Sequence, residues 1–388
     1  MKKILTLNNI SPAGLELLPR ECYEVASEIQ HPDAILLRSF KMHDMPIPST
    51  LKAVGRAGAG VNNIPVQAMS ERGIPVFNAP GANANAVKEL VIAGLLIASR
   101  NICQAWQYAR SLEGDDDLIN KMVEQGKKQF AGIELPGRKL GVIGLGAIGR
   151  SVANTAVDLG MEVFGYDPGI TVQGALKLST NVNYCASVDE LLSRVDFVTL
   201  HVPLVEATRN KINRDRIQSM PDQATILNFS RQGIVDDEAV LDALDSGKLR
   251  AYICDFPTNR IKNHPKVVAL PHLGASTLEA EENCAKMVVR QVRDFLEKGN
   301  IRNSVNFPEA VMEPVSGTRL AIANSNIPNM LGQISTVIAN AGLNIIDMLN
   351  RSRDDLAYTL LDIEGDLTQE VVDQVASIEG VLMARIPG

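Results

Sequence analysis

A glycine-rich segment that follows an apolar run is the feature that most limits what this chain can fold into. Residues 140–143 predict a buried strand, and Gly144, Gly146 and Gly149 then form a GxGxxG pattern at the start of a predicted helix. In such a unit the first glycine permits a tight turn, the second lets backbone approach a pyrophosphate, and the third lets the helix pack closely on the strand. The segment therefore predicts a dinucleotide-binding unit in a parallel α/β sheet.

An acidic residue after the next predicted strand indicates which dinucleotide binds. Residues 162–166 predict that strand, and Asp167 follows it. A carboxylate at this position accepts hydrogen bonds from the ribose hydroxyls of NAD and repels the 2′-phosphate of NADP. The next residues are Pro168 and Gly169 rather than an arginine, so the sequence favours NAD.

Short apolar runs alternate with helical patterns as far as residue 298, which is typical of parallel α/β folds. Strands are predicted at residues 4–7, 35–38, 53–56 and 75–78, followed by a long helical region at about 84–110. The alternation restarts with strands at 140–143, 162–166, 196–201, 224–228, 251–254 and 267–270, and a long helix at 276–298.

A different pattern follows a segment rich in proline and asparagine at residues 302–317, which is predicted to be a linker. Beyond it, strands are predicted at 320–323, 344–349, 357–363 and 381–386, and helices at 329–341 and 368–378. This βαββαβ order predicts a ferredoxin-like unit at the C-terminus.

The composition argues against several classes of partner. A formal net charge of −7 argues against a protein that binds nucleic acid or an anionic membrane. The longest apolar run, residues 90–99, is too short to span a bilayer, and no secretory signal follows Met1. The five cysteines are odd in number and form no CxxC pair, which argues against a disulfide scaffold or a zinc ribbon. We therefore expect a cytoplasmic protein without a metal site.

Two residues that follow predicted strands are candidate catalytic groups. Arg231 comes just after the strand at 224–228, and His272 just after the strand at 267–270. Ligands of open parallel sheets bind at this carboxyl end of the strands. An arginine there can hold a carboxylate through two parallel hydrogen bonds, and a histidine can exchange a proton near neutral pH. On position alone, each is equally well explained as a structural residue.

Several motifs together resemble the D-isomer-specific 2-hydroxyacid dehydrogenase family. The matching segments, in family order, are residues 54–64, 78–81, 141–149, 200–204, 228–236 and 271–277. The resemblance implies an α/β enzyme in which a Rossmann-type NAD domain, residues 99–284, is inserted in a flavodoxin-like substrate domain, residues 1–98 and 285–305. Residues 306–317 would then be a linker, and residues 318–388 resemble a ferredoxin-like ACT regulatory domain.

The same resemblance implies roles for individual residues. Arg231 would hold the carboxylate and carbonyl oxygen of the substrate, and His272 would take the proton of the C2 hydroxyl as hydride passes to NAD. The family's NAD contacts, many through the backbone, fall on Gly144, Gly146, Ala147, Ile148, Gly149, Asp167, Val202, Phe229, Asp255, Gly274 and Ala275. The substrate loop falls on Arg56, Ala57, Gly58, Ala59 and Gly60. The candidates for holding a substrate phosphate are Arg38, Arg56, Lys127 and Lys128, each of which is also explained as an ordinary surface charge.

One departure from the family pattern concerns the partner of His272. The family carries a glutamate there, which raises the basicity of the histidine. At the two plausible alignments this chain has Asn259 and Arg260, neither of which is a carboxylate. Either the histidine works with a neutral partner, or a carboxylate from elsewhere replaces the glutamate.

The function that the resemblance implies is oxidation of 3-phospho-D-glycerate to 3-phosphohydroxypyruvate, the entry to L-serine biosynthesis. The alternatives are a dehydrogenase for another 2-hydroxy acid, such as glycerate or a phosphorylated sugar acid, and an NAD-sensing regulatory protein on the same scaffold. A homodimer or homotetramer is implied, with residues 115–130 as a candidate contact between subunits. Asn324, Asn326 and Asn344 fall on positions where ACT domains bind amino acids, which predicts L-serine as an effector.

Overall fold

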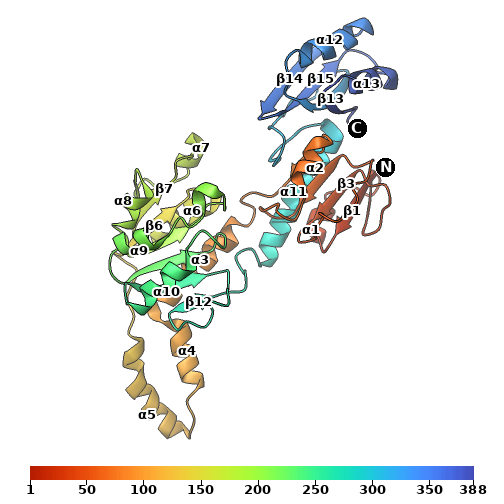
Figure 1. The fold of residues 1–388 in the computed structure, drawn as a ribbon. Helices are drawn as coiled ribbons and strands as arrows, with labels where there is room; N and C mark the ends of the chain where they lie inside the picture. Colours follow the sequence, from red (N-terminus) through yellow and green to blue (C-terminus); the bar gives the residue numbers. More distant parts are fainter. The chain divides into compact units, whose positions relative to one another are not determined.

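The computed structural model describes all 388 residues, and its contacts divide the chain into two compact units (Figure 1). Unit 1 comprises Met1–Asn83 and Leu278–Gly388, and unit 2 comprises Ala84–Thr277. Unit 2 is therefore one continuous segment, and unit 1 consists of the segments before and after it. No helix of either unit combines the length and the apolar character needed to cross a bilayer.

Unit 2 is built on a seven-stranded parallel sheet with the strand order β12-β11-β10-β9-β6-β7-β8. The strands are β6 (Lys139–Ile143), β7 (Glu162–Tyr166), β8 (Val182–Tyr184), β9 (Phe197–Leu200), β10 (Ala224–Asn228), β11 (Leu249–Cys254) and β12 (Val267–Ala269). The first six strands in chain order, β6 to β11, follow the Rossmann order, and β6 and β9 are adjacent where that order reverses. The sequence predicted every strand but β8, a short edge strand that is largely exposed.

Helices cover both faces of this sheet because the strands are apolar on both sides. Leu140 and Val142 of β6 lie in one buried cluster with α3 (Ala84–Arg100) and α6 (Ala147–Asp158), whereas Ile143 lies in a second cluster. That second cluster contains residues of α8 (Val188–Leu192), α9 (Arg214–Ser219) and α10 (Asp237–Asp245). The remaining helical segments of the sheet region are α7 (Val172–Ala175) and the 3₁₀ turn η2 (Glu206–Thr208).

The domain boundary predicted after residue 98 needs correction, as does the one predicted at residue 284. Helix α3 packs on α6 and on the inner strands of the unit 2 sheet, so this unit begins at Ala84 and ends at Thr277. The helical region predicted at 84–110 is also two helices, because Asn101 adopts a left-handed conformation with φ 52° and breaks it. Helix α4 (Ile102–Arg110), helix α5 (Asp116–Gly126) and the turn η1 (Lys127–Phe130) extend away from the sheet (Figure 1).

Unit 1 contains a five-stranded parallel sheet in the flavodoxin-like order β2-β1-β3-β4-β5. Its strands are β1 (Lys2–Leu7), β2 (Tyr23–Ala26), β3 (Ala34–Leu37), β4 (Ala53–Arg56) and β5 (Val76–Phe77), and its helices are α1 (Pro12–Leu15), α2 (Val66–Glu71) and α11 (Leu278–Lys298). Helix α11 approaches β4 closely at Gly55, where an added Cβ would lie 2.8 Å from a methyl carbon of Val288.

A second sheet of unit 1 is antiparallel and has the order β14-β15-β13-β16. In chain order, the strands of this sheet and the two helices packed on it are β13 (Thr318–Ser325), α12 (Met330–Asn340), β14 (Ile345–Arg353), β15 (Leu356–Ile363), α13 (Gln369–Ala376) and β16 (Val381–Arg385). This is the predicted βαββαβ order of a ferredoxin-like unit. Side chains of Leu320 and Ile322 pack under the two helices, whereas Ala321 and Ala323 face a core shared with α11 and β3.

The segment at residues 306–317, predicted to be a linker, is packed rather than loose. The side chain of Asn306 accepts a hydrogen bond from the amide of Val76 at 2.9 Å and donates one to the carbonyl of Ile74 at 3.0 Å. Phe307 is completely buried in the core that the two sheets share. The segment that leads into the antiparallel sheet is therefore not a flexible linker.

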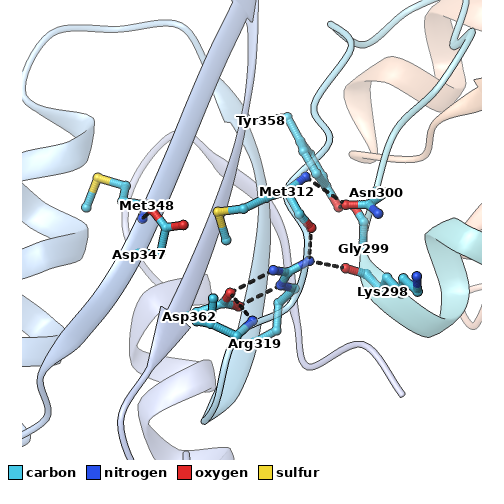
Figure 2. A network of polar contacts seen from close by, with 10 residues as sticks. Lys298, Gly299, Asn300, Met312, Arg319, Asp347, Met348, Tyr358 and Asp362 are labelled. Atoms are coloured by element: carbon cyan, nitrogen blue, oxygen red, sulfur yellow. Dashed lines mark hydrogen bonds and ion pairs between the residues drawn. The ribbon is translucent and has the colours of Figure 1, made fainter.

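A buried ion pair fastens the antiparallel sheet to the end of α11 (Figure 2). Arg319 of β13 donates to both carboxylate oxygens of Asp362 on β15, at 2.6 and 2.7 Å. Its remaining nitrogen, Nη1, donates to the carbonyls of Met312 at 2.6 Å and Lys298 at 3.1 Å. Nearby, the Tyr358 hydroxyl donates to the carbonyl of Gly299 at 2.8 Å. One guanidinium thus links a strand pair, the 306–317 segment and the last residue of α11.

Candidate active site

The glycine loop of unit 2 has the geometry that a dinucleotide pyrophosphate requires. Gly144 has φ +92°, and a Cβ there would lie 2.6 Å from the carbonyl oxygen of His201. A Cβ at Gly149 would lie 1.8 Å from the Gly144 carbonyl oxygen, so neither position accepts a side chain. At Gly146, by contrast, no atom lies within 4 Å of the Cβ position. This open space precedes Ala147, the first residue of α6, and the helix N-terminus attracts anions.

Asp167 lies directly after β7 and reaches across to this loop. Its carboxylate accepts hydrogen bonds from the amide of Leu145 at 2.7 Å and from the amide of Gly169 at 2.8 Å. The carboxylate is therefore held beside the glycine loop, where a ribose would follow the pyrophosphate of a bound dinucleotide. These residues fit NAD, with the loop amides toward the pyrophosphate and Asp167 toward the ribose hydroxyls.

Other positions on the predicted NAD surface lie along the carboxyl ends of the same strands. Val202 follows β9, and its carbonyl accepts a hydrogen bond from the Ser230 hydroxyl. Phe229 is buried, and its ring packs against Gly94 of α3, so this residue has only its backbone to offer a ligand. Ile148 and Ala275 are half-buried.

Arg231 and His272 both lie at the ligand-binding edge of this sheet. Arg231 follows β10 and is exposed, and its Nη1 donates to the Ser230 carbonyl at 2.7 Å. The side chain of Asn228, the last residue of β10, donates to the Arg231 carbonyl at 2.9 Å and so fixes the turn. His272 follows β12 and is also exposed. The sheet therefore presents both residues at the edge that carries the glycine loop.

The loop that carries His272 is held by a fully buried carboxylate. His272 has φ 58°, a left-handed conformation that is uncommon for a residue other than glycine. Asp255 accepts hydrogen bonds from the amides of Leu273 and Gly274, both at 2.7 Å, and its carbonyl accepts from the amide of His272 at 3.1 Å. Asp255 falls on an NAD-contact position of the family, and in this structure its side chain holds the histidine loop.

The surroundings of the His272 ring differ from the carboxylate partner that the family pattern implies. The ring packs against the ring of Phe256, with centroids 5.0 Å apart. Asp255, the acid nearest in the sequence to Asn259 and Arg260, has both oxygens engaged by loop amides. Arg260 forms an ion pair with Glu238 at 3.4 Å instead of facing the histidine. No local pattern in the sequence indicates the contact between His272 and Phe256.

A second histidine of unit 2 is poorly suited to proton transfer. His201 follows β9, and its Nε2 lies 3.0 Å from the Thr199 hydroxyl. Burial lowers the pKa of His201 to about 3, so the ring is neutral at physiological pH. Of the two histidines at this edge of the sheet, His272 is the better candidate acid and base.

The predicted substrate residues lie in unit 1, at the ends of two neighbouring strands. Arg38 follows β3 and Arg56 ends β4, and the Nε of Arg56 donates to the Arg38 carbonyl at 3.1 Å. The loop Ala57–Gly60 continues from β4, and the Asn78 side chain donates to the Ala59 carbonyl at 2.6 Å. The structure thus brings together Arg38, Arg56 and the loop that the sequence proposed.

Comparison with known sequences places these features in a family. Residues 92–274 match the description "D-isomer specific 2-hydroxyacid dehydrogenase, NAD binding domain". A D-3-phosphoglycerate dehydrogenase of Haemophilus influenzae is 33% identical over 351 residues, which cover 87% of this chain and 81% of that protein. This chain belongs to the D-isomer-specific 2-hydroxyacid dehydrogenase family. A D-3-phosphoglycerate dehydrogenase of Methanocaldococcus jannaschii is 35% identical over 370 residues, and the match spans 65% of its length.

Solved structures of the family agree with the fold. An NAD⁺-bound 3-phosphoglycerate dehydrogenase of Entamoeba histolytica is 26% identical, with a TM-score of 0.63 over 79% of this chain and 98% of that one. A glyoxylate reductase of Paecilomyes thermophila is 25% identical, with a TM-score of 0.66 over 78% of this chain and 98% of the other. About a fifth of this chain is thus without a counterpart in either structure. Family membership gives this chain a dehydrogenase NAD-binding domain at residues 92–274.

Replacing Asp167 by alanine should weaken NAD binding by about 10- to 100-fold, because a hydrogen bond to a charged group contributes about 1.5–3 kcal/mol. The preference for NAD over NADP should narrow as well, since the repulsion of a 2′-phosphate is lost. Cofactor titration by calorimetry measures both effects, and Asp158→Ala on the exposed end of α6 is the control for a change in net charge. Equal catalytic efficiency of the unmodified enzyme with the two cofactors would contradict this role.

Proposed function

We propose that this protein oxidises 3-phospho-D-glycerate to 3-phosphohydroxypyruvate with NAD, the first step of L-serine biosynthesis. The observation that carries the proposal is that Arg231, His272 and the glycine loop follow strands β10, β12 and β6 of one parallel sheet. The names of the relatives that match most of this chain support the choice of substrate.

The chemistry assigned to the residues is a coupled loss of a proton and a hydride. Bound NAD supplies the hydride acceptor. Arg231 holds the substrate carboxylate in its guanidinium fork and fixes C2 for reaction. His272 takes the hydroxyl proton while the C2–H electron pair leaves as hydride, so the C2–O bond becomes a carbonyl. Asp255 keeps the histidine loop in its left-handed conformation during the step.

A steady-state assay of NADH formation tests the proposal. The expected result is turnover with 3-phospho-D-glycerate at a higher kcat/KM than with D-glycerate. A preference for unphosphorylated D-glycerate would indicate a dehydrogenase for another 2-hydroxy acid. NAD binding without turnover of any such acid would indicate the NAD-sensing alternative.

We further propose that the chain associates with a second copy through α4 and α5. Neither helix has a buried residue, although both carry large apolar side chains. Ile102 and Trp106 of α4 and Leu118 and Val123 of α5 are exposed. A surface of this kind is typical of an interface. Sedimentation of the full chain should therefore give a dimer or a larger species.

The antiparallel sheet of unit 1 is proposed to act as an ACT domain that binds L-serine. Asn324, at the end of β13, is only 1% exposed, and its Oδ1 accepts no hydrogen bond. A buried acceptor without a donor is uncommon, and the ammonium group of an amino acid would satisfy it. Asn326 donates to the Asp354 carbonyl at 3.0 Å, whereas Asn344 donates to Glu364 at 3.1 Å.

Asp354 and Glu364, the partners of Asn326 and Asn344, lie beyond opposite ends of β15, because this strand begins at Leu356 and ends at Ile363. Asn326 and Asn344 of one chain therefore lie at opposite ends of the sheet. An effector that contacts both residues must lie between two chains.

L-serine at millimolar concentration is expected to lower substrate affinity by about 5- to 150-fold, the usual range of coupling between sites. Asn326→Ala should abolish the inhibition, because the variant removes an amide that is able to hold the serine carboxylate. Asn340→Ala, at the exposed end of α12, should respond like the unmodified protein. Titration of serine into the assay, with calorimetry in parallel, gives the result. The absence of both heat and inhibition would leave the sheet as an assembly module.

A further inference from the structure

The two arginines proposed to bind the substrate share their surroundings with a carboxylate. Glu281 lies in the first turn of α11, and its Oε1 is 2.7 Å from Nη1 of Arg38. Both side chains are partly exposed, at 35% for Arg38 and 40% for Glu281, so the pair is open to a solute. Nothing in the sequence signalled this contact, because the two residues are far apart in the chain.

The surroundings of Cys284 indicate that both arginines face the same part of α11. Cys284 lies one turn after Glu281 and is buried. Burial raises the pKa of the Cys284 thiol, and the positive charges of Arg56 and Arg38 oppose this shift. Two cations and one carboxylate thus surround one turn of the helix.

This grouping limits how the site can hold a phosphate. A guanidinium has five N–H donors and binds an anion best through two parallel hydrogen bonds. Because Glu281 takes up a donor at Nη1 of Arg38, fewer N–H donors of this guanidinium are open to a substrate while the carboxylate is in place. A phosphate monoester carries a charge of about −1.5 to −2 at pH 7, so it is also repelled by a carboxylate that stays.

We propose that Glu281 is a specificity-determining residue that competes with the substrate's phosphate for Arg38. The inference rests on the proposed function, which makes the substrate a phosphate monoester, and on the prediction from the sequence that Arg38 and Arg56 hold its phosphate. With Glu281 in place, the charge of Arg38 is balanced by a carboxylate. The site therefore discriminates less strongly between phosphorylated and unphosphorylated 2-hydroxy acids than it would without this carboxylate.

The variant that tests this competition is Glu281→Gln, which keeps the size of the side chain and removes its charge. The KM for 3-phospho-D-glycerate is expected to fall by about 3- to 10-fold, in line with the modest strength of a partly exposed ion pair acting on a doubly charged group. The KM for D-glycerate should change by less than about 2-fold, because this acid has no phosphate to be repelled.

The matched control is Glu282→Gln, on the next residue of the same helix. Glu282 pairs with Lys286 at 3.0 Å, so the substitution changes the net charge equally but away from the arginines. No change in the preference between the two acids is expected for this variant. Equal changes in both variants would show an effect of net charge alone and would overturn the proposal.

Binding of inorganic phosphate, measured by calorimetry, separates this inference from the proposed function. If Glu281→Gln binds phosphate more tightly than the unmodified protein, the competition holds, even where 3-phospho-D-glycerate proves not to be the substrate. If phosphate affinity and the KM for 3-phospho-D-glycerate both stay the same or worsen, Glu281 does not compete for Arg38. If the unmodified enzyme still oxidises 3-phospho-D-glycerate in that case, the proposed function holds and only the role of Glu281 is wrong.

Discussion

Replacement of His272 by alanine is expected to lower kcat by about 10²- to 10⁴-fold, the usual contribution of a positioned acid or base. The loss should fall on kcat more than on KM, because His272 acts on the hydroxyl proton, whereas Arg231 binds the carboxylate. Steady-state NADH formation with 3-phospho-D-glycerate measures the effect.

A second substitution separates proton transfer from the loop conformation. His272 has φ 58°, and asparagine tolerates such a left-handed conformation better than most residues. The amides of Leu273 and Gly274 would still donate to Asp255. His272→Asn should therefore keep the loop and NAD binding but lose turnover as severely as His272→Ala. Turnover near that of the unmodified enzyme in either variant would remove His272 from the role of acid and base.

The parallel sheets were predictable because their signals are local. Strands β6, β7 and β10 are short apolar runs bounded by turn residues, and the glycine pattern after β6 ties the turn to a ligand. The two missed strands, β2 and β8, are edge strands. Each is covered on fewer sides, so its sequence is less apolar, and Val182–Tyr184 is too short to show a period.

The boundaries were predicted less well, because they depend on packing between distant segments. Helix α3 is amphipathic wherever it docks, and only its contacts with α6, β10 and β11 place it in unit 2. In the same way, prolines and asparagines at 306–317 indicate a loop, but they do not show that Asn306 bonds to the strand region near Val76.

In the candidate site too, residues with local signals were predicted, and contacts between distant side chains were not. Gly144 and Asp167 directly follow strands, and Arg231 and His272 come shortly after β10 and β12, so their common edge could be inferred from topology. The pairing of Arg38 with Glu281 and the packing of Phe256 on His272 join side chains whose orientation no local pattern encodes. Asp255 is an intermediate case, since its position was foreseen and its engagement with the histidine loop was not.

Removal of one partner of the buried ion pair should have the largest effect on stability. Arg319 is 7% exposed and Asp362 is 2% exposed. Asp362→Ala is expected to lower the free energy of unfolding of unit 1 by about 3–5 kcal/mol, because it leaves a buried guanidinium without its counter-charge. Since the single tryptophan, Trp106, lies in unit 2, hydrogen exchange of β13 and β15 peptides is the appropriate measurement.

Two further variants identify the cause of that loss. Glu313→Ala removes a carboxylate that lies 3.9 Å from Lys298 and is 77% exposed, so it should cost less than about 1 kcal/mol. The double variant Arg319→Met with Asp362→Leu removes both charges, and apolar pairs of similar size often replace buried ion pairs without loss. Recovery should be partial here, because the carbonyls of Met312 and Lys298 lose the donors that Arg319 supplied. Equal loss in Glu313→Ala and Asp362→Ala would show that the buried pair does not fasten the sheet to α11.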